Sequence, residues 1–165
     1  MSEKEYLIDL LKKAGIKTPI SETMKKLRQS NEIHIGAVLR LGESLQRSSS
    51  KKNFIDQEGQ AKRRYKLWSR ERTFRVVIAD SKEDKCEAVL TEFLKIIDKG
   101  IVIDGNWIDI TVGNPDWVDA EDSVLKSKMG VQVSITFTGG IYEDKDRKKI
   151  GVKVQIDKEG TDGNN

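Results

Sequence analysis

The residues with the greatest chemical reactivity are few in this sequence and stand far apart. His34 is the single histidine and Cys86 the single cysteine. His34 lies in the segment 33–41, whose odd positions are apolar, so we expect a polar strand residue that faces solvent or a neighbour. Cys86 falls on the apolar side of a predicted helix, where cysteine usually behaves as a small buried hydrophobe. The sequence contains no HExxH or CxxC motif, so we predict no catalytic residues, no metal, no cofactor and no enzyme activity.

A cluster of carboxylates is the second group that could do chemistry. Its members lie within the seven residues 116–122 and are Asp116, Asp119, Glu121 and Asp122. Such a cluster can hold Ca²⁺ or act as a general acid and base, but this one lacks the spacing of an EF-hand loop. We expect a solvated or subunit-facing loop, and a metal-dependent enzyme remains an alternative.

A basic run over residues 62–72 interleaves cations with aromatic residues, in the order Lys-Arg-Arg-Tyr-Lys-Leu-Trp-Ser-Arg-Glu-Arg. Phosphate contacts combined with base stacking use this combination of side chains, so a nucleic-acid-binding module over 62–75 is one hypothesis. The same run is also typical of a strand that faces an acidic neighbour, or that lines a ring through which DNA passes. Density of charge alone leaves these alternatives open.

The strand predicted over 131–142 alternates apolar and small polar residues and ends near the pair Gly139-Gly140. No Lys-Ser/Thr follows the glycines, so they do not form a phosphate-binding loop. We interpret them as a bulge or bend that lets the strand leave its own sheet.

Hydrophobic periodicity predicts the elements that position these groups. Helical spacing predicts a helix over 3–14, a weaker helix after Ser21, and a long helix that begins near Ser81 with Asp84 completing a capping box. Alternation predicts strands over 33–41, 73–79, 101–103, 107–112, 131–142 and 150–156, the last two joined by a charged turn at 143–149. The predicted fold class is α+β, a mostly antiparallel sheet with one long and one or two short helices packed on it.

Length and composition indicate a single domain with a highly charged surface. Of 165 residues, 35% are charged and 36% hydrophobic, which predicts a modest core. We expect one domain over 1–157, with the polar segment 44–64 as an extended arm or loop, and a disordered tail over 158–165. No apolar run is long enough to span a bilayer, the N-terminus does not resemble a secretory signal, and a lone cysteine suits a reducing cytoplasm.

The charge is unevenly divided along the chain. Residues 1–75 carry 18 Lys and Arg against 9 Asp and Glu, a formal charge of +9, whereas residues 76–165 carry 12 against 18, a formal charge of −6. A chain with a basic and an acidic half can assemble head to tail, basic face against acidic face.

Several short motifs in the second half resemble small tail proteins of clostridial-type phages and phage-tail-like bacteriocins. These motifs are Gly105-Asn-Trp-Ile-Asp-Ile110, Asp116-Trp-Val-Asp119, Asp122-Ser-Val-Leu125 and Phe137-Thr-Gly-Gly-Ile-Tyr142. The order of elements is also similar to that of phage tail terminator or collar proteins. The resemblance covers about residues 33–156 and is firmest over 72–142.

The resemblance implies a structural protein of a contractile tail rather than a catalyst. It implies a homo-oligomeric ring, usually a hexamer, that caps the tail tube and sheath, assembles in the bacterial cytoplasm and then belongs to the particle. The implied partners are the chain itself, the tube protein and the sheath protein, with no membrane, and with DNA only passing through the ring. Another tail or head–tail completion protein is the alternative within this class.

The two lines of reasoning together select a set of interface candidates. Exposed aromatic side chains such as Trp107 and Trp117 can anchor an interface, with ordinary core packing as the alternative. The full set of candidate subunit-interface residues is Arg63, Arg64, Arg70, Arg72, Trp117, Asp119, Asp122, Gly139, Gly140 and Tyr142.

Overall fold

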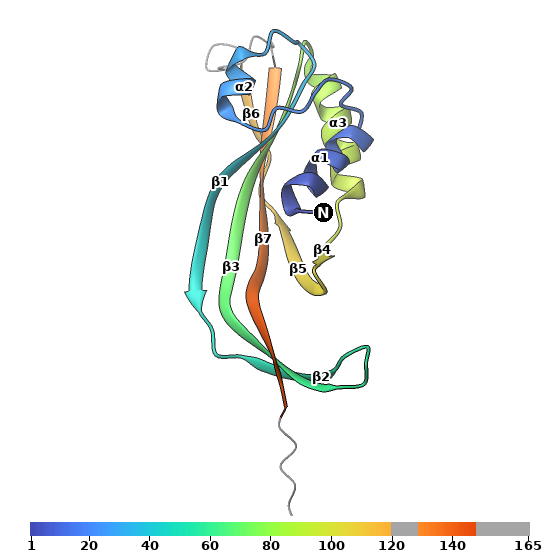
Figure 1. Ribbon diagram of the computed structural model, residues 1–165. Coiled ribbons are helices and arrows are strands. Elements are labelled where there is room, and N and C mark those ends of the chain that lie inside the picture. The colour runs from blue at the N-terminus through green and yellow to red at the C-terminus, as the bar shows by residue number, and fades with distance from the viewer. Residues whose placement is uncertain (120–128, 148–165) are drawn as a thin grey trace, which may run out of the picture.

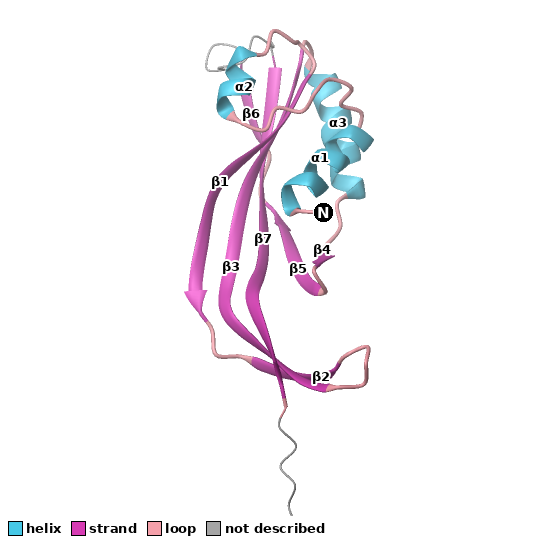
Figure 2. Cartoon of the chain, viewed as in Figure 1, coloured by secondary structure: helices cyan, strands magenta, loops and turns pink. Residues whose placement is uncertain are grey.

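The computed structural model describes residues 1–119 and 129–147 of the chain. Within these ranges the elements are α1 (Glu3–Lys13), α2 (Met24–Gln29), β1 (Ile35–Arg47), β2 (Lys51–Ile55), β3 (Ala61–Asp80), α3 (Glu83–Ile96), β4 (Gly100–Ile103), β5 (Asn106–Val112), β6 (Asp116–Asp119) and β7 (Met129–Asp146). All of these strands pair antiparallel in one sheet, with the helices packed against it (Figures 1 and 2). The predicted α+β class is therefore confirmed. The predicted domain boundary at 157 and the tail 158–165 lie outside the described residues.

Two long strands form the centre of the sheet. β3 pairs with β7 from Asp80 opposite Met129 to Lys62 opposite Asp146. β1 and then β2 pair along the other edge of β3, while β6 and β5 pair along the other edge of β7, with β4 outside β5. The pairing of β5 with β7 ends at Thr138, so the rest of the outer edge of β7 has no strand partner among the described residues. Unpaired edges of this kind offer backbone donors and acceptors to another chain.

The main core lies between the sheet and the helices α1 and α3 (Figure 1). α1 begins at a capping box, in which Glu5 N donates to Ser2 Oγ and Ser2 N donates to Glu5 Oε2; this arrangement satisfies two backbone donors of the first turn. Its buried apolar side chains are Tyr6, Leu7, Leu10 and Leu11, at helical spacing. Phe137 of β7 packs edge-to-face on Phe74 of β3 with ring centroids 5.7 Å apart, an arrangement that aromatic quadrupoles favour.

A second, smaller core covers the opposite face of the same end of the sheet. It contains Leu27 of α2 with Ile35, Ala37, Leu39, Val77 and Ala79 of the sheet. β1 and β3 are therefore buried on both faces here, which explains the nearly continuous apolar run at the end of β3. Residues before Thr73 in β3 and after Leu39 in β1 are at least partly exposed, because neither core extends beyond this end.

The polar segment 44–64 forms the far end of the sheet. We call residues 44–66, together with 139–146 of β7, the arm. The turn between β2 and β3 is held by Asp56, whose Oδ1 accepts from Glu58 N and Gln60 N. Gly59 has φ of +77°, a conformation that favours glycine. None of the described helices covers the arm, and its tip curves toward the side on which α1 and α3 lie (Figure 1).

Several local predictions differ from the structure. β7 continues through the residues predicted as a charged turn, because residues 143–146 pair with β3; the strand predicted over 150–156 lies outside the described residues. Ser81 does not cap α3, because its hydroxyl donates to Asp80 instead. The N-cap of α3 is Lys82, which makes no capping hydrogen bond with its side chain. His34 lies just before β1 rather than within a strand.

Candidate functional site

Two arginines of β3 are held by carboxylates from two other elements. Arg72 Nη1 donates to Glu3 Oε2 at 2.7 Å, and Arg72 Nε donates to Glu43 Oε1 at 3.4 Å. Arg70 also donates to Glu43, which lies opposite Arg72 in the β1–β3 pair. The hydrogen bond from Arg70 lowers the pKa of Glu43, so this carboxylate is charged at neutral pH. The resulting line of alternating charges connects the first turn of α1 with β3 and β1.

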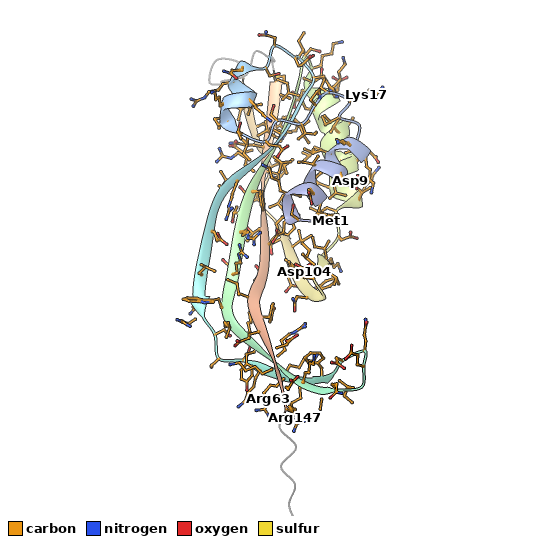
Figure 3. All side chains as sticks on the ribbon, viewed as in Figure 1. Met1, Asp9, Lys17, Arg63, Asp104 and Arg147 are labelled. Carbon is orange, nitrogen blue, oxygen red and sulfur yellow. The ribbon has the colours of Figure 1, made fainter. Side chains whose placement is uncertain are left out.

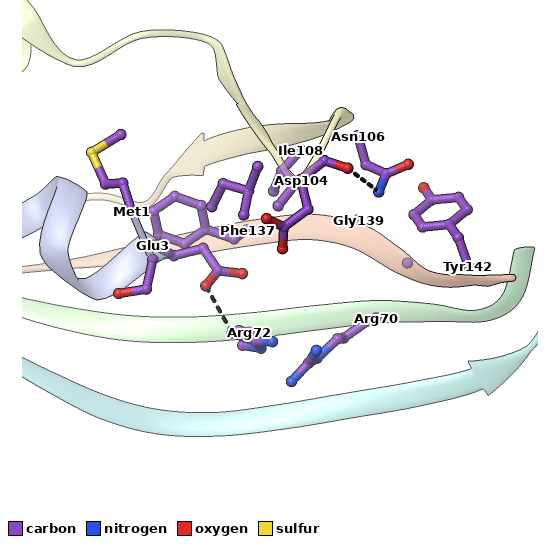
Figure 4. A pocket seen from close by; sticks show the side chains of 13 residues that line it. Met1, Glu3, Arg70, Arg72, Asp104, Asn106, Ile108, Phe137, Gly139 and Tyr142 are labelled. Atoms are coloured by element: carbon purple, nitrogen blue, oxygen red, sulfur yellow. Dashed lines mark hydrogen bonds and ion pairs between the residues drawn. The ribbon is translucent and has the colours of Figure 1, made fainter. Parts of the chain in front are cut away.

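These two arginines line a hollow of about 410 Å³ on the face of the sheet that carries α1 and α3. We call it the central hollow. The N-terminus of α1 and the turn between β4 and β5 form its other walls (Figure 4). Its lining includes five of the residues selected from sequence: Arg70, Arg72, Gly139, Gly140 and Tyr142. The fold thus brings together residues from two distant segments, and their role in an interface stays a prediction.

The glycine pair makes room for neighbouring side chains. A Cβ on Gly140 would lie 2.6 Å from Lys66 Cε and 2.8 Å from the backbone oxygen of Trp68, and a Cβ on Gly139 would lie 3.2 Å from Ile108. β7 stays paired with β3 on both sides of the pair, so the interpretation that the strand leaves its sheet here is wrong. The irregularity is in β3, where Leu67 is the extra residue of a bulge. A bulge re-aims the side chains around it.

Phe137 and Tyr142 show the effect of this irregular stretch. They are five positions apart in β7, a spacing that places side chains on opposite faces of a regular strand. Both nevertheless line the central hollow, and Tyr142 points toward Asn106 on the β4–β5 turn (Figure 4). The glycine pair lies between these two residues, and the bulge of β3 pairs with the same stretch of β7.

The remaining arginines of the basic run lie in the arm. Arg64 makes a bidentate pair with Asp144, with both N–O distances at 2.7 Å, and Arg64 Nη1 donates to Asn106 Oδ1 at 2.9 Å. The hydrogen bond from Arg64 lowers the pKa of Asp144. Arg63 Nε donates to Asn53 Oδ1, across the β2–β3 pair. Arg64, Arg70 and Arg72 are thus paired with carboxylates, which reduces the positive charge that the run 62–75 offers to phosphates, whereas Arg63 keeps its charge because its partner is a neutral amide.

The acidic candidates lie at the other end of β7. Trp117 sits opposite Val131 in the β6–β7 pair and is 39% exposed, and Asp119 ends β6. Asp116 accepts a hydrogen bond from Gln132 Nε2 at 2.7 Å. Asp122 lies outside the described residues. The ten candidates therefore do not form one site, because Trp117 and Asp119 are separated from the central hollow by the length of the core.

His34 contacts Asp80 of β3, and Cys86 is buried. His34 Nδ1 lies 2.8 Å from Asp80 Oδ2, joining the start of β1 to the end of β3. Burial raises the pKa of Cys86 to about 11, so its thiol stays protonated at neutral pH and is a poor nucleophile. No group of three or more His, Cys, Asp or Glu in residues 1–119 and 129–147 is placed to hold a metal ion. None of the described helices is long and apolar enough to cross a membrane.

Three carboxylates that organise the site were not among the candidates: Glu3, Glu43 and Asp144. Of these three, only Glu43 could have been predicted from the sequence, because a hairpin that turns near residues 56–60 places it opposite Arg72. Glu3 and Asp144 reach their arginines from segments 69 and 80 residues away in the sequence, and no local pattern indicates those contacts.

Comparison with known proteins finds similarity of structure and not of sequence. No protein-family model matches the chain, and no curated protein matches it. Among solved structures, the chain is similar to the sheath/tube terminator of PVC, an extracellular contractile injection system, determined by cryo-electron microscopy in its extended state. The TM-score is 0.45 and the sequence identity is 10% over 95% of this chain and 63% of the other. The chain thus spans less than two thirds of that protein.

Proposed function

We propose that this protein is a structural component of a contractile phage tail or tail-like bacteriocin. It forms a homo-oligomeric ring, with six subunits as the expected number, that terminates the tail tube and sheath. Its partners are further copies of itself, the tube protein and the sheath protein. It assembles in the bacterial cytoplasm and then remains in the particle, with no catalytic role.

The observation that carries this proposal is the length of sheet edge left without a partner strand. Among the described residues, the outer edge of β1 pairs only through the bridge between Ser21 and Ala37, and the outer edge of β7 is unpaired beyond Thr138. Strand edges of this length favour addition of strands from other chains. A ring needs two different, complementary faces on each subunit, and the two edges of one sheet supply such a pair.

Two further features support the same function. Three of the motifs that resemble tail proteins, at 105–110, 116–119 and 137–142, fall on the strands β5, β6 and β7, which lie in one sheet. The basic segment 62–66 and the acidic strand β6 lie at opposite ends of the β3–β7 pair, so side chains of opposite charge stand at the two ends of the sheet. Charge separation of this kind orients subunits and disfavours wrong pairings.

The proposal is tested on particles from cells with and without the gene. Tails that contain the protein should end in a cap visible by negative-stain microscopy, and native mass spectrometry of released caps should give a closed ring of identical subunits. Tails from the deletion strain should lack the cap and vary in length, and the wild-type gene supplied in trans should restore both properties. An unchanged cap in the deletion strain would contradict the proposal.

A further inference from the structure

A second hollow lies between the arm and the turn that joins β4 to β5. It has a volume of about 350 Å³, and its polar and aromatic lining includes Lys51, Lys52, Arg64, Lys66, Trp107 and Tyr142. We call it the basic hollow. The hydrogen bond from Arg64 to Asn106 connects its two sides. It shares Tyr142 and Asn106 with the central hollow, so the two form neighbouring parts of one concave surface.

The lining of the basic hollow carries positive charge that the fold does not use. It contains four cations and no carboxylate. Arg64 is paired with Asp144, but Lys51, Lys52 and Lys66 take part in none of the ion pairs formed among the described residues. Lys66 lies over Gly140, where any other residue would crowd its side chain. These three lysines thus line the hollow without a carboxylate partner among the described residues.

Two aromatic side chains lie beside these lysines. Trp107 is 55% exposed, and its indole N–H donates to Asp109 Oδ1 at 2.8 Å, so its orientation is set while its ring remains accessible. Tyr142 is half-buried between the two hollows. Rigid aromatic groups next to cations are typical of interface anchors, because they bury a large area at little entropic cost.

The surroundings favour an acidic peptide over a nucleic acid. The outer edge of β7 beyond Thr138 offers backbone groups that only a peptide can pair with. In an extended peptide, alternate side chains lie about 6.6 Å apart on one face, which suits carboxylates meeting several lysines in turn.

We propose that the basic hollow binds an extended acidic segment of another protein, whose carboxylates pair with Lys51, Lys52 and Lys66 while its apolar groups contact Trp107 and Tyr142. The chain's own acidic strand, β6, is held in its sheet by pairing with β7, so a different protein is the source. The inference rests on the proposed function, because that function makes the binding partner another component of the same particle. Peptide binding is measured on the isolated chain, so a failure here leaves ring formation and capping untouched.

The test uses fluorescence anisotropy with a labelled peptide, Glu-Val-Glu-Thr-Glu-Val-Glu, and the isolated protein at physiological ionic strength. The peptide should bind, and its glutamine counterpart Gln-Val-Gln-Thr-Gln-Val-Gln should bind at least about tenfold more weakly. Replacing Lys51, Lys52 and Lys66 by Gln should also weaken binding about tenfold. A matched variant with Lys12, Lys25 and Lys26 replaced by Gln has the same change in net charge on exposed helix positions and should bind like the wild type.

Circular dichroism checks that the triple variant is folded, and Lys66→Gln alone provides a milder variant if it is not. Equal binding of the two peptides, equal loss in both triple variants, or no binding of the acidic peptide would overturn the proposal. Tighter, lysine-dependent binding of an oligothymidylate would replace it with a nucleic-acid site. Self-association of the chain that is lost only in the Lys51, Lys52 and Lys66 variant would replace the partner protein with a second copy.

Discussion

Along β3 and β7, the half of the sheet under α1 and α3 differs in its side chains from the half that forms the arm. Under the helices, Phe74 and Val76 of β3 and Phe137 of β7 are almost fully buried. In the arm, Arg64 and Lys66 of the same β3 are half-buried and surrounded by polar groups. Two continuous strands thus pass from a hydrophobic core to a charged, partly open surface (Figure 3).

This difference separates the part that makes the fold from the part that is available to partners. Burial of apolar side chains contributes on the order of 1.5–3 kcal/mol each, whereas exposed ion pairs contribute about 0–1 kcal/mol. The core can therefore hold the register of β3 and β7, and the arm continues that register with little stabilisation of its own. A stable core from which a polar sheet with unpaired strand edges extends is suited to contacts with other chains.

The largest expected effect is the loss of a core aromatic ring. Phe137→Ala should lower the free energy of unfolding by about 3–5 kcal/mol, since it leaves a cavity beneath α1. The matched change in the arm, Phe54→Ala, removes a half-buried ring near Arg64 and should cost about 1 kcal/mol or less. Urea denaturation measures both values. Equal losses would show that the arm is stabilised as strongly as the core.

The glycine pair gives the next effect, at the junction of the two halves. Gly140→Ala should destabilise the protein by about 1–3 kcal/mol, because its Cβ would press on the backbone oxygen of Trp68. Gly42→Ala is the control, since a Cβ there meets nothing within 4 Å, and it should be neutral or stabilising by up to about 1 kcal/mol. A Gly140 variant as stable as the Gly42 variant would mean that the strands at the bulge adjust freely.

The ion pair between Glu3 and Arg72 should contribute more than a pair in solvent. The side chain of Glu3 is 10% exposed, and Glu3→Gln should cost about 1–2 kcal/mol because it weakens a charge-assisted hydrogen bond in a shielded place. Asp9→Asn breaks the exposed pair with Lys13 on the same helix and should cost about 0.3–0.5 kcal/mol. Thermal unfolding of the two variants decides whether α1 is attached to the sheet partly through Arg72.

The smallest expected effect is on the pH dependence of the arm. The pKa of Asp144 is lowered by Arg64 and that of Asp56 by Lys62, from an ordinary 3.8. A carboxyl group with a lowered pKa in the folded state stabilises the fold above its unfolded pKa, and that contribution is lost as the pH falls through the folded value. Acidification below about pH 4 should therefore loosen the arm before the core.

Amide chemical shifts followed by NMR during the titration can check this order. Signals from β2 and the β2–β3 turn should change first, and those of α3 last. Simultaneous changes in both regions would contradict the idea that the two halves are stabilised independently.

The local pattern of apolar residues was sufficient to predict much of the fold. Alternation of apolar residues placed β5 and most of β7, and the apolar stripe from Cys86 to Phe93 placed α3, because one buried face imposes its own period on each element. The polar composition of 44–64 indicated an arm or a loop but could not say which strands it would extend. The charged residues 143–146 looked like a turn because they have no buried face, and only their pairing with β3 makes them strand.

The sequence by itself therefore determined the type of each element that buries an apolar face, the class of the fold and the uneven division of charge. The tertiary structure alone decided which charges meet and which remain without counter-charges. Arg72 pairs with Glu3, Arg64 pairs with Asp144, and Lys51, Lys52 and Lys66 line the basic hollow. The physical reason is that these groups come together through strand register and packing between segments far apart in the chain, for which a local period carries no information.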